Sequence, residues 1–124
     1  QLGFGRLKIE GEPLYDLARV KQLAVNADCI KLFTRTCISE VHKLFDSDTE
    51  QVADLIQALN KQDYIDSEWC ENGKSGVAAC DAYSIRRAEV IPATGKTITV
   101  GYFLKFAIGK TGQLVLMVSC HLSR

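Results

Sequence analysis

Residues 101–122, GYFLKFAIGKTGQLVLMVSCHL, predict two β-strands joined by a short turn. Over residues 98–108 large apolar side chains occupy every second position, the period of a strand with one buried face. Residues 114–121 alternate more weakly, because both faces of that strand are largely apolar. The opposite face of the hairpin carries Lys105, Ser119 and His121. These polar positions form either an ordinary solvated surface or a functional one.

The composition predicts a single domain over residues 1–124. A chain of 124 residues with 47% hydrophobic and 24% charged residues can bury one core and is too short for two. Fifteen basic and fifteen acidic residues give a net charge of zero. The molecule as a whole therefore does not attract a polyanion, and nucleic-acid binding would need a local basic patch.

The cysteines indicate a reducing compartment. They are odd in number, scattered, and contain no C-x-x-C pair: Cys29, Cys37, Cys70, Cys80 and Cys120. No apolar run approaches the roughly 20 residues of a membrane span, and no stretch has the layout of a signal peptide. We therefore expect a cytoplasmic protein with no membrane partner.

The first half of the chain has helical periodicity. After a short strand expected at about residues 4–9, apolar side chains recur at helical spacing in residues 14–28, 34–45 and 47–59. Thr34 or Thr36 is a candidate cap for the second helix, and Ser47 with Glu50 predicts a capping box for the third. We expect the three amphipathic helices to share one side of a sheet.

The pattern changes to strands from residue 63 onward. Strands are expected in residues 63–69, 78–91, 98–108 and 114–121, with Gly-rich and Pro-containing turns between them. Helices followed by strands predict an α+β fold, with three N-terminal helices packed on one side of an antiparallel sheet.

The spacing of the residues fits neither a phosphate-binding loop nor a zinc site. Each Gly-Lys-Thr triplet would need a further glycine to form a phosphate-binding loop, but Val90 and Leu104 occupy those positions. A zinc site is disfavoured because the cysteines and the two histidines, His42 and His121, lack ligand spacing.

Six segments carry a family resemblance. They are PLYDLARVKQLA (13–24), TRTCISEV (34–41), DYIDS (63–67), CDAYSI (80–85), YFLKFAI (102–108) and LVLMVSCHLS (114–123). In order and spacing this layout resembles the MqsR family of toxins from type II toxin-antitoxin modules, over roughly residues 13–122. The resemblance implies a RelE-like fold with a twisted sheet. It also implies a ribosome-independent endoribonuclease that cleaves single-stranded mRNA, and a cognate antitoxin protein that silences it.

The resemblance further implies catalysis without a metal or other cofactor. The substrate 2′-hydroxyl would attack the adjacent phosphate, while side chains on the open sheet face move protons and stabilise charge. The family's polar set is only partly present here. Asp66 stands where the family motif D-F-Y-K-S has its lysine, and Cys80 stands where W-Q-D-V-Y has its glutamine. In the family motif Y-L-K, the tyrosine is replaced by Phe103 and the lysine is retained as Lys105.

The family's terminal S-F-K becomes Ser119, Cys120 and His121. His121 is then the candidate general base or acid, and Lys105 the candidate stabiliser of the phosphorane. Further candidates for substrate binding are Ser119, Arg86 or Arg87 for a flanking phosphate, Lys74 in place of the lost lysine, and Tyr102 through a register shift. The two arginines alternate across a strand, so at most one can belong to the site.

Two functions remain open. The first is a toxin-like endoribonuclease with an altered active site, which the polar set at Lys105, Ser119 and His121 favours. The alternative is a non-catalytic protein-binding module on the same scaffold. The net charge of zero and the loss of the family's lysine, glutamine and tyrosine favour this alternative.

Overall fold

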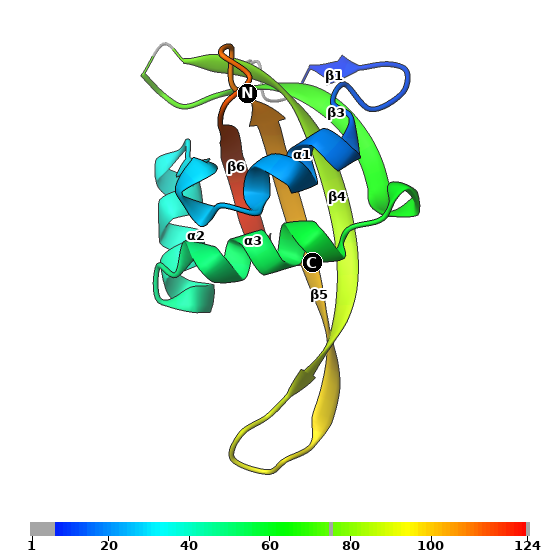
Figure 1. Ribbon diagram of the computed structural model, residues 1–124, viewed down its shortest axis with the longest axis vertical. Helices are drawn as coiled ribbons and strands as arrows, with labels where there is room; N and C mark the ends of the chain where they lie inside the picture. Colours follow the sequence, from blue (N-terminus) through cyan, green and yellow to red (C-terminus); the bar gives the residue numbers. More distant parts are fainter. Residues whose placement is uncertain (1–6, 75, 124) are drawn as a thin grey trace.

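The computed structural model describes residues 7–74 and 76–123, which build a six-stranded sheet (Figure 1). The strands are β1 (Lys8–Ile9), β2 (Ile30–Leu32), β3 (Tyr64–Glu71), β4 (Val77–Val90), β5 (Thr97–Ile108) and β6 (Val115–Leu122). Their order across the sheet is β1-β3-β4-β5-β6-β2. Neighbours are antiparallel except β2 and β6, which run parallel, so the sheet is mixed.

Three α-helices and two short 3-10 helices lie within the described residues. They are α1 (Leu17–Ala24), η2 (Ala27–Cys29), α2 (Arg35–Phe45), α3 (Thr49–Ala58) and η3 (Lys61–Asp63). Each α-helix begins after a side chain that accepts a hydrogen bond from a first-turn N–H, namely Asp16, Thr34 and Asp48. None of the described helices has the length and apolar character needed to cross a membrane.

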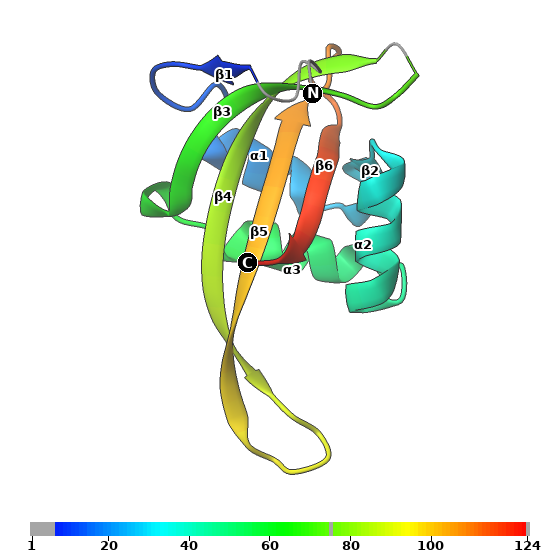
Figure 2. The ribbon, with the colours of Figure 1, turned by 180° about the vertical axis from the view of Figure 1, so that it is seen from behind.

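The expected RelE-like arrangement, with three N-terminal helices packed on one side of an antiparallel sheet, is wrong. The helices are interspersed among the strands, because β1 precedes α1 and β2 lies between α1 and α2. With three residues, β2 is too short to display a period of two, and its parallel pairing with β6 makes the sheet mixed. Figures 1 and 2 show α1 and α3 over one face of the sheet, whereas α2 stands beside β6.

Within the described residues the first strand comprises Lys8–Ile9, and residues 4–6 of the expected strand lie outside them. The expected cap of the third helix needs correction. The third helix is capped by Asp48, whose Oδ1 accepts from Glu50 N at 3.0 Å, and not by Ser47. Asp46 and Ser47 both adopt left-handed conformations, with φ of 54° and 67°. This tight turn moves the cap of α3 by one residue, from Ser47 to Asp48, and the helix starts at Thr49.

The core lies between the helices and one face of the central strands. The helices contribute Leu17, Val20, Leu23, Ala24, Cys37, Val41, Phe45, Val52, Leu55 and Ile56, all buried. Strands β4 and β5 contribute aromatic rings from the facing side. Tyr83 stacks on Phe106 at 5.3 Å between ring centroids, and Tyr102 stacks on Phe45 of α2 at 6.1 Å. Burial of these rings holds the helices on this face of the sheet.

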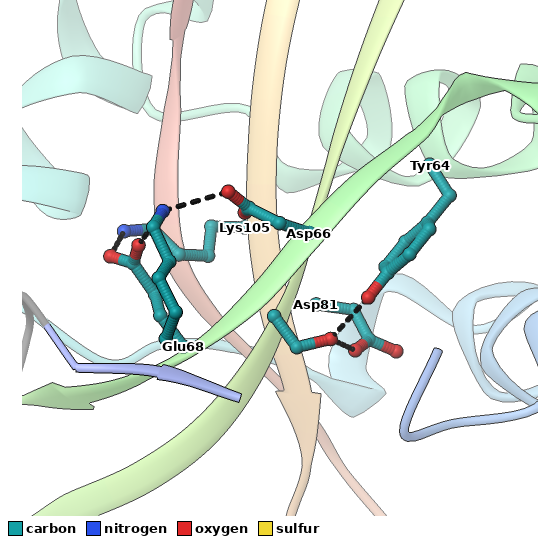
Figure 3. Close-up of polar contacts among 7 residues, drawn as sticks. Tyr64, Asp66, Glu68, Asp81 and Lys105 are labelled. Atoms are coloured by element: carbon teal, nitrogen blue, oxygen red, sulfur yellow. Dashed lines mark hydrogen bonds and ion pairs between the residues drawn. The ribbon is translucent and has the colours of Figure 1, made fainter. Parts of the chain in front are cut away.

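A buried carboxylate joins the segment before α1 to the middle of the sheet. Asp81 on β4 is fully buried and accepts hydrogen bonds from Leu14 N and Tyr15 N, both at 3.0 Å, and from Ser67 Oγ at 2.6 Å. The Tyr64 hydroxyl lies 2.6 Å from Ser67 Oγ and extends this chain of polar groups (Figure 3). Three donors replace the water that the carboxylate lost, so Asp81 fixes the entry to α1 against β4.

The edge of β6 is covered by two different elements. β2 pairs with the first residues of β6, and side chains of α2 and its cap form hydrogen bonds with the backbone of the residues that follow. The Thr34 hydroxyl donates to Val118 O at 2.9 Å, and Cys120 N donates to Glu40 Oε1 at 3.0 Å. Side chains of α2 and its cap therefore occupy backbone groups that an edge strand would otherwise leave free.

The ends of β4 and β5 project beyond the helices as a two-stranded ribbon, at the lower end of the molecule in Figure 1. Two of its apolar side chains, Val90 and Ile98, are 63% and 45% exposed. At its base, Arg87 pairs with Glu89 at 2.6 Å and lies over the Tyr102 ring, 5.3 Å from its centroid. These contacts mark the boundary between the packed part of the hairpin and the solvated part.

We expect Asp81→Asn to lower the free energy of unfolding by about 2–4 kcal/mol, because an amide N–H group would face the Leu14 or Tyr15 N–H. Urea denaturation of wild type and variant measures this difference. Asp54→Asn, at an exposed position on α3, is the matched control and should change stability little. A wild-type value for Asp81→Asn would show that the buried carboxylate does not anchor the fold.

Candidate functional site

The face of the sheet that α1 and α3 leave uncovered carries two cross-strand rows of side chains. Residues directly opposite in an antiparallel pair point to the same face. One row runs from Asp66 through Ala82 and Lys105 to Ser119, and the other runs from Ser84 through Phe103 to His121. Figure 2 shows this face with β3 to β6 in front of α1 and α3.

A groove of about 610 Å³ lies over these rows. It is lined by Thr36 and Glu40 from α2, by Ile65 and Glu68 from β3, by Ser84, Phe103 and Lys105 from the central strands, and by Ser119, His121 and Ser123. Ile65 reaches the groove because the β3–β4 register shifts between Tyr64 and Asp66. Such a bulge re-aims one side chain without ending the strand. The groove thus combines one lysine, one histidine, two carboxylates and several hydroxyl groups.

Lys105 belongs to a cluster of four charges. Its Nζ lies 2.9 Å from Glu68 Oε2, and the second oxygen of Glu68 lies 2.6 Å from Lys8 Nζ on β1. Lys8 also pairs with Asp66 at 2.7 Å. Figure 3 shows Lys105, Glu68 and Asp66 directed toward one another, away from the Tyr64 and Asp81 network. Two cations and two carboxylates leave the cluster with no net charge.

The charge cluster keeps both central groups ionised. Burial opposes the charged form of Lys105, but the hydrogen bond to Glu68 and the neighbouring negative charges outweigh it, and the Lys105 pKa is raised. Burial likewise opposes the carboxylate of Glu68, but hydrogen bonds from Lys8 and Lys105 prevail, and the Glu68 pKa is lowered. An ammonium group and a carboxylate therefore persist side by side across the neutral range.

His121 is oriented by its own strand and by Phe103. Its Nδ1 lies 2.7 Å from Leu122 O, and because a carbonyl oxygen can only accept, Nδ1 carries the proton. The neutral ring then presents an unprotonated Nε2. The imidazole stacks on Phe103, with 5.0 Å between centroids and 19° between planes. Phe103 also lies beneath Lys105, whose Nζ is 5.9 Å from the ring centroid.

The groove brings together three of the residues that the sequence singled out, namely Lys105, Ser119 and His121. Tyr102 does not join them: it is buried on the helix side of β5 and donates to Glu89 at 3.0 Å. The β5–β6 register pairs Phe103 with His121, so the register shift that would bring Tyr102 to this face is absent from the described hairpin.

The other candidate cations lie outside the groove. Arg87 shares the helix side with Tyr102, whereas Arg86 is exposed and lies opposite Gly101 on the open face. Lys74 lies in the turn between β3 and β4, where its backbone N donates to Asn72 Oδ1 at 2.8 Å. The alternation of Arg86 and Arg87 across the strand is as the sequence predicted.

Sequence reasoning missed Glu68, Glu40 and Lys8. Glu68 lies two residues after Asp66 on β3 and therefore shares its face, a signal that was present in the alternation. Glu40 and Lys8 gave no such signal, because they reach this region from α2 and from an edge strand of two residues. Only the tertiary arrangement places them beside the groove.

Comparison with known proteins adds no assignment. No family model matches the chain, and no curated protein or solved structure is significantly similar to it. Within residues 7–74 and 76–123, no three side chains of histidine, cysteine, aspartate or glutamate gather as a metal site would require. The side chains of the groove themselves define the chemistry that it can perform.

We expect Glu68→Gln to lower the free energy of unfolding at pH 7 by about 1–3 kcal/mol, because it deprives the largely buried Lys105 ammonium of its carboxylate. Since the folded-state pKa of Glu68 is lowered, its stabilisation is present above the ordinary carboxyl range and is lost as pH falls through the folded value. Urea denaturation between pH 7 and about pH 3 should therefore show the two proteins converging.

Glu71→Gln is the matched control, because Glu71 is exposed on the same strand. A stability difference for Glu68→Gln that stays constant from neutral to acid pH would contradict the role assigned to the carboxylate.

Proposed function

We propose that the groove binds single-stranded RNA and cleaves it, as the resemblance to the MqsR toxins implies. The observation that carries the proposal is the meeting of His121, Lys105 and Ser119 in one groove on the open sheet face. A general base, a cation and a hydroxyl group on a rigid sheet are the components that transesterification of RNA requires.

His121 is the base in this proposal. Its Nε2 would take the proton of a 2′-hydroxyl, whose oxygen then forms a bond to the adjacent phosphorus. The bond between phosphorus and the 5′-oxygen breaks, and that oxygen takes a proton from water in the open groove. Phe103 holds the imidazole plane, and the Leu122 carbonyl holds the tautomer. Histidine suits this step because it exchanges protons near neutral pH.

Lys105 would stabilise the pentacoordinate phosphorus, although it is paired in the free protein. To reach a phosphate it must turn away from Glu68, which would strand a carboxylate that is only 11% exposed if nothing else held it. Lys8 already bonds the other oxygen of Glu68 at 2.6 Å. The second cation therefore lowers the free-energy cost of releasing Lys105 to the substrate.

A second function is favoured by the charge of the groove. Its lining includes two carboxylates, Glu68 and Glu40, against one lysine, so it offers a polyanion little net attraction. A non-catalytic module that binds a protein partner through this face would tolerate that balance. The two functions differ in whether purified protein breaks RNA.

We expect purified protein to cleave a long unstructured RNA at discrete positions in the presence of EDTA. His121→Ala and Lys105→Met should each slow cleavage by about 10²-fold or more, since one removes the base and the other the cation. A 2′-deoxy nucleotide at a cleaved position should block cleavage there, because the attacking oxygen is gone. Gel-resolved single-turnover rates measure all three effects.

His42→Ala and Lys43→Met are the matched controls, because both residues are exposed on α2 and absent from the groove lining. Intact RNA with folded wild-type protein would reject the nuclease and leave the binding module as the function. Equal losses in the control and groove variants would show that the groove is not the site.

If Lys8 helps to release Lys105 from Glu68, removing its charge should slow cleavage. Lys8→Gln should lower kcat/KM by roughly threefold to tenfold, because Glu68 then holds Lys105 without a competing cation. Lys31→Gln, exposed on β2, is the control. An unchanged kcat/KM would mean that Lys105 does not depend on Lys8 for its release.

A further inference from the structure

Two cysteines lie side by side next to the groove without taking part in the proposed cleavage. Cys70 on β3 and Cys80 on β4 belong to strands that pair directly, with Cys70 opposite Ala78 and Glu68 opposite Cys80. Both cysteines therefore point to the open face, diagonally across the strand pair. They are free thiols, packed with Ala107 and Val118 in a small apolar cluster of their own.

The two thiols lie together and close to a cation. Both thiols belong to one buried cluster, and the Lys105 ammonium is held 2.9 Å from Glu68 Oε2, on the residue that lies opposite Cys80 and two positions before Cys70. The Cys80 thiol donates to the Ala78 carbonyl oxygen, 3.6 Å from its Sγ, and Cys70 offers the Cys80 proton a second acceptor. A thiolate is the stronger acceptor of the two, so ionisation of Cys70 directs the Cys80 proton toward it.

The surroundings of the two thiols shift their pKa values in opposite directions. The hydrogen bond from Cys80 and the charge of Lys105 outweigh burial and lower the pKa of Cys70 below that of an ordinary thiol. The hydrogen bond to Cys70, together with burial, raises the pKa of Cys80. Cys70 is thus the more acidic thiol of the pair, and Cys80 holds its proton more firmly.

We propose that Cys70 and Cys80 form a peroxide-reactive pair, in which Cys70 attacks the peroxide and Cys80 then closes a disulfide. The shared face and buried cluster of the two thiols, with the Lys105 ammonium that Glu68 holds beside them, are the geometry on which this rests. Neither cysteine lines the groove, so the oxidation does not require RNA cleavage, although Lys105 acts in both.

The reaction is balanced by hydrogen peroxide as the oxidant. The Cys70 thiolate attacks one peroxide oxygen, the O–O bond breaks, and the departing hydroxide takes a proton to become water, which leaves a sulfenic acid. The Cys80 sulfur then attacks the Cys70 sulfur, and the hydroxyl group leaves as a second water with the Cys80 proton. Two thiols are oxidised to one disulfide as one peroxide is reduced to two waters.

Access to the pair suits a small oxidant, and closure of the disulfide needs the strands to move. Cys70 is 4% exposed and Cys80 is fully buried, so a water-sized peroxide meets Cys70 first. Diagonal neighbours are typically about 7–8 Å apart, beyond the roughly 4.4–6.8 Å between Cα atoms that a disulfide usually spans, so closure has to draw the strands together. β3 ends at Glu71, one residue after Cys70, and the turn that follows can absorb this movement.

The chain contains a matched internal control. Cys37 and Cys120 are also buried, both belong to the main core cluster, and among the described residues no cation lowers the pKa of either thiol. Burial raises the pKa of Cys37, and it raises the pKa of Cys120 to about 12. If burial of two thiols in one cluster were sufficient, this pair would oxidise as readily as Cys70 and Cys80.

The test is treatment of the reduced full chain with hydrogen peroxide, followed by intact mass measurement and peptide mapping. We expect the loss of two hydrogen atoms and a peptide that links Cys70 to Cys80, with Cys37 and Cys120 still reduced. In Cys80→Ser, a dimedone adduct should form on Cys70, whereas Cys70→Ser should slow oxidation of Cys80 at least tenfold. The wild-type map alone decides the matter if a variant does not fold.

The ammonium group is tested through the pH dependence of the reaction. The oxidation rate of wild type should rise with pH and level off at a lower pH than that of an ordinary thiol, and Lys105→Met should move the midpoint upward by about one unit. Lys110→Met, at an exposed turn position, should leave it unchanged. Fastest oxidation at Cys29, a link between other cysteines, or an unmoved midpoint in Lys105→Met would each overturn the proposal.

Discussion

The buried carboxylate of Asp81 ties the segment before α1, β3 and β4 together. A fully buried charge is tolerated only when donors surround it, and here the donors come from the segment before α1 and from β3. The first helix, the strand that carries Glu68 and the central strand β4 are therefore tied at one point. An error in any one of them would leave a buried charge without a partner.

That point is one peptide bond away from the open face. Along β4, Cys80 and Ala82 point to the open face, whereas Asp81 points to the helices. The residue that anchors the core is thus flanked by two that face the charged cluster and the thiol pair. Glu68 lies opposite Cys80 and Lys105 lies opposite Ala82, so the charged pair of the groove sits beside the residues that flank the anchored carboxylate.

The sequence predicts the individual helices and strands better than it predicts how they are arranged in space. The helical stripes and the alternating strands placed α1 to α3 and β3 to β6 within a few residues, because each is long enough to show its period. β2 was not predicted, because three residues are too few to show a period of two. For the same reason its parallel pairing with β6 and the interspersed order of helices and strands were not predicted. Lys105, Ser119 and His121 were grouped by strand parity alone, whereas Lys8 and Glu40 depend on tertiary placement that no local pattern encodes.

The ribbon formed by the ends of β4 and β5 shares its strands with the groove but not its support. Above the contacts of Arg87, Glu89 and Tyr102 the two strands are covered by helices, and beyond them they stand in solvent. Residues can be added to or removed from the ribbon in pairs without changing the register of the strands beneath the groove. The tip of the ribbon is therefore the place where this chain can vary in length, or carry a label, with the least effect on its chemistry.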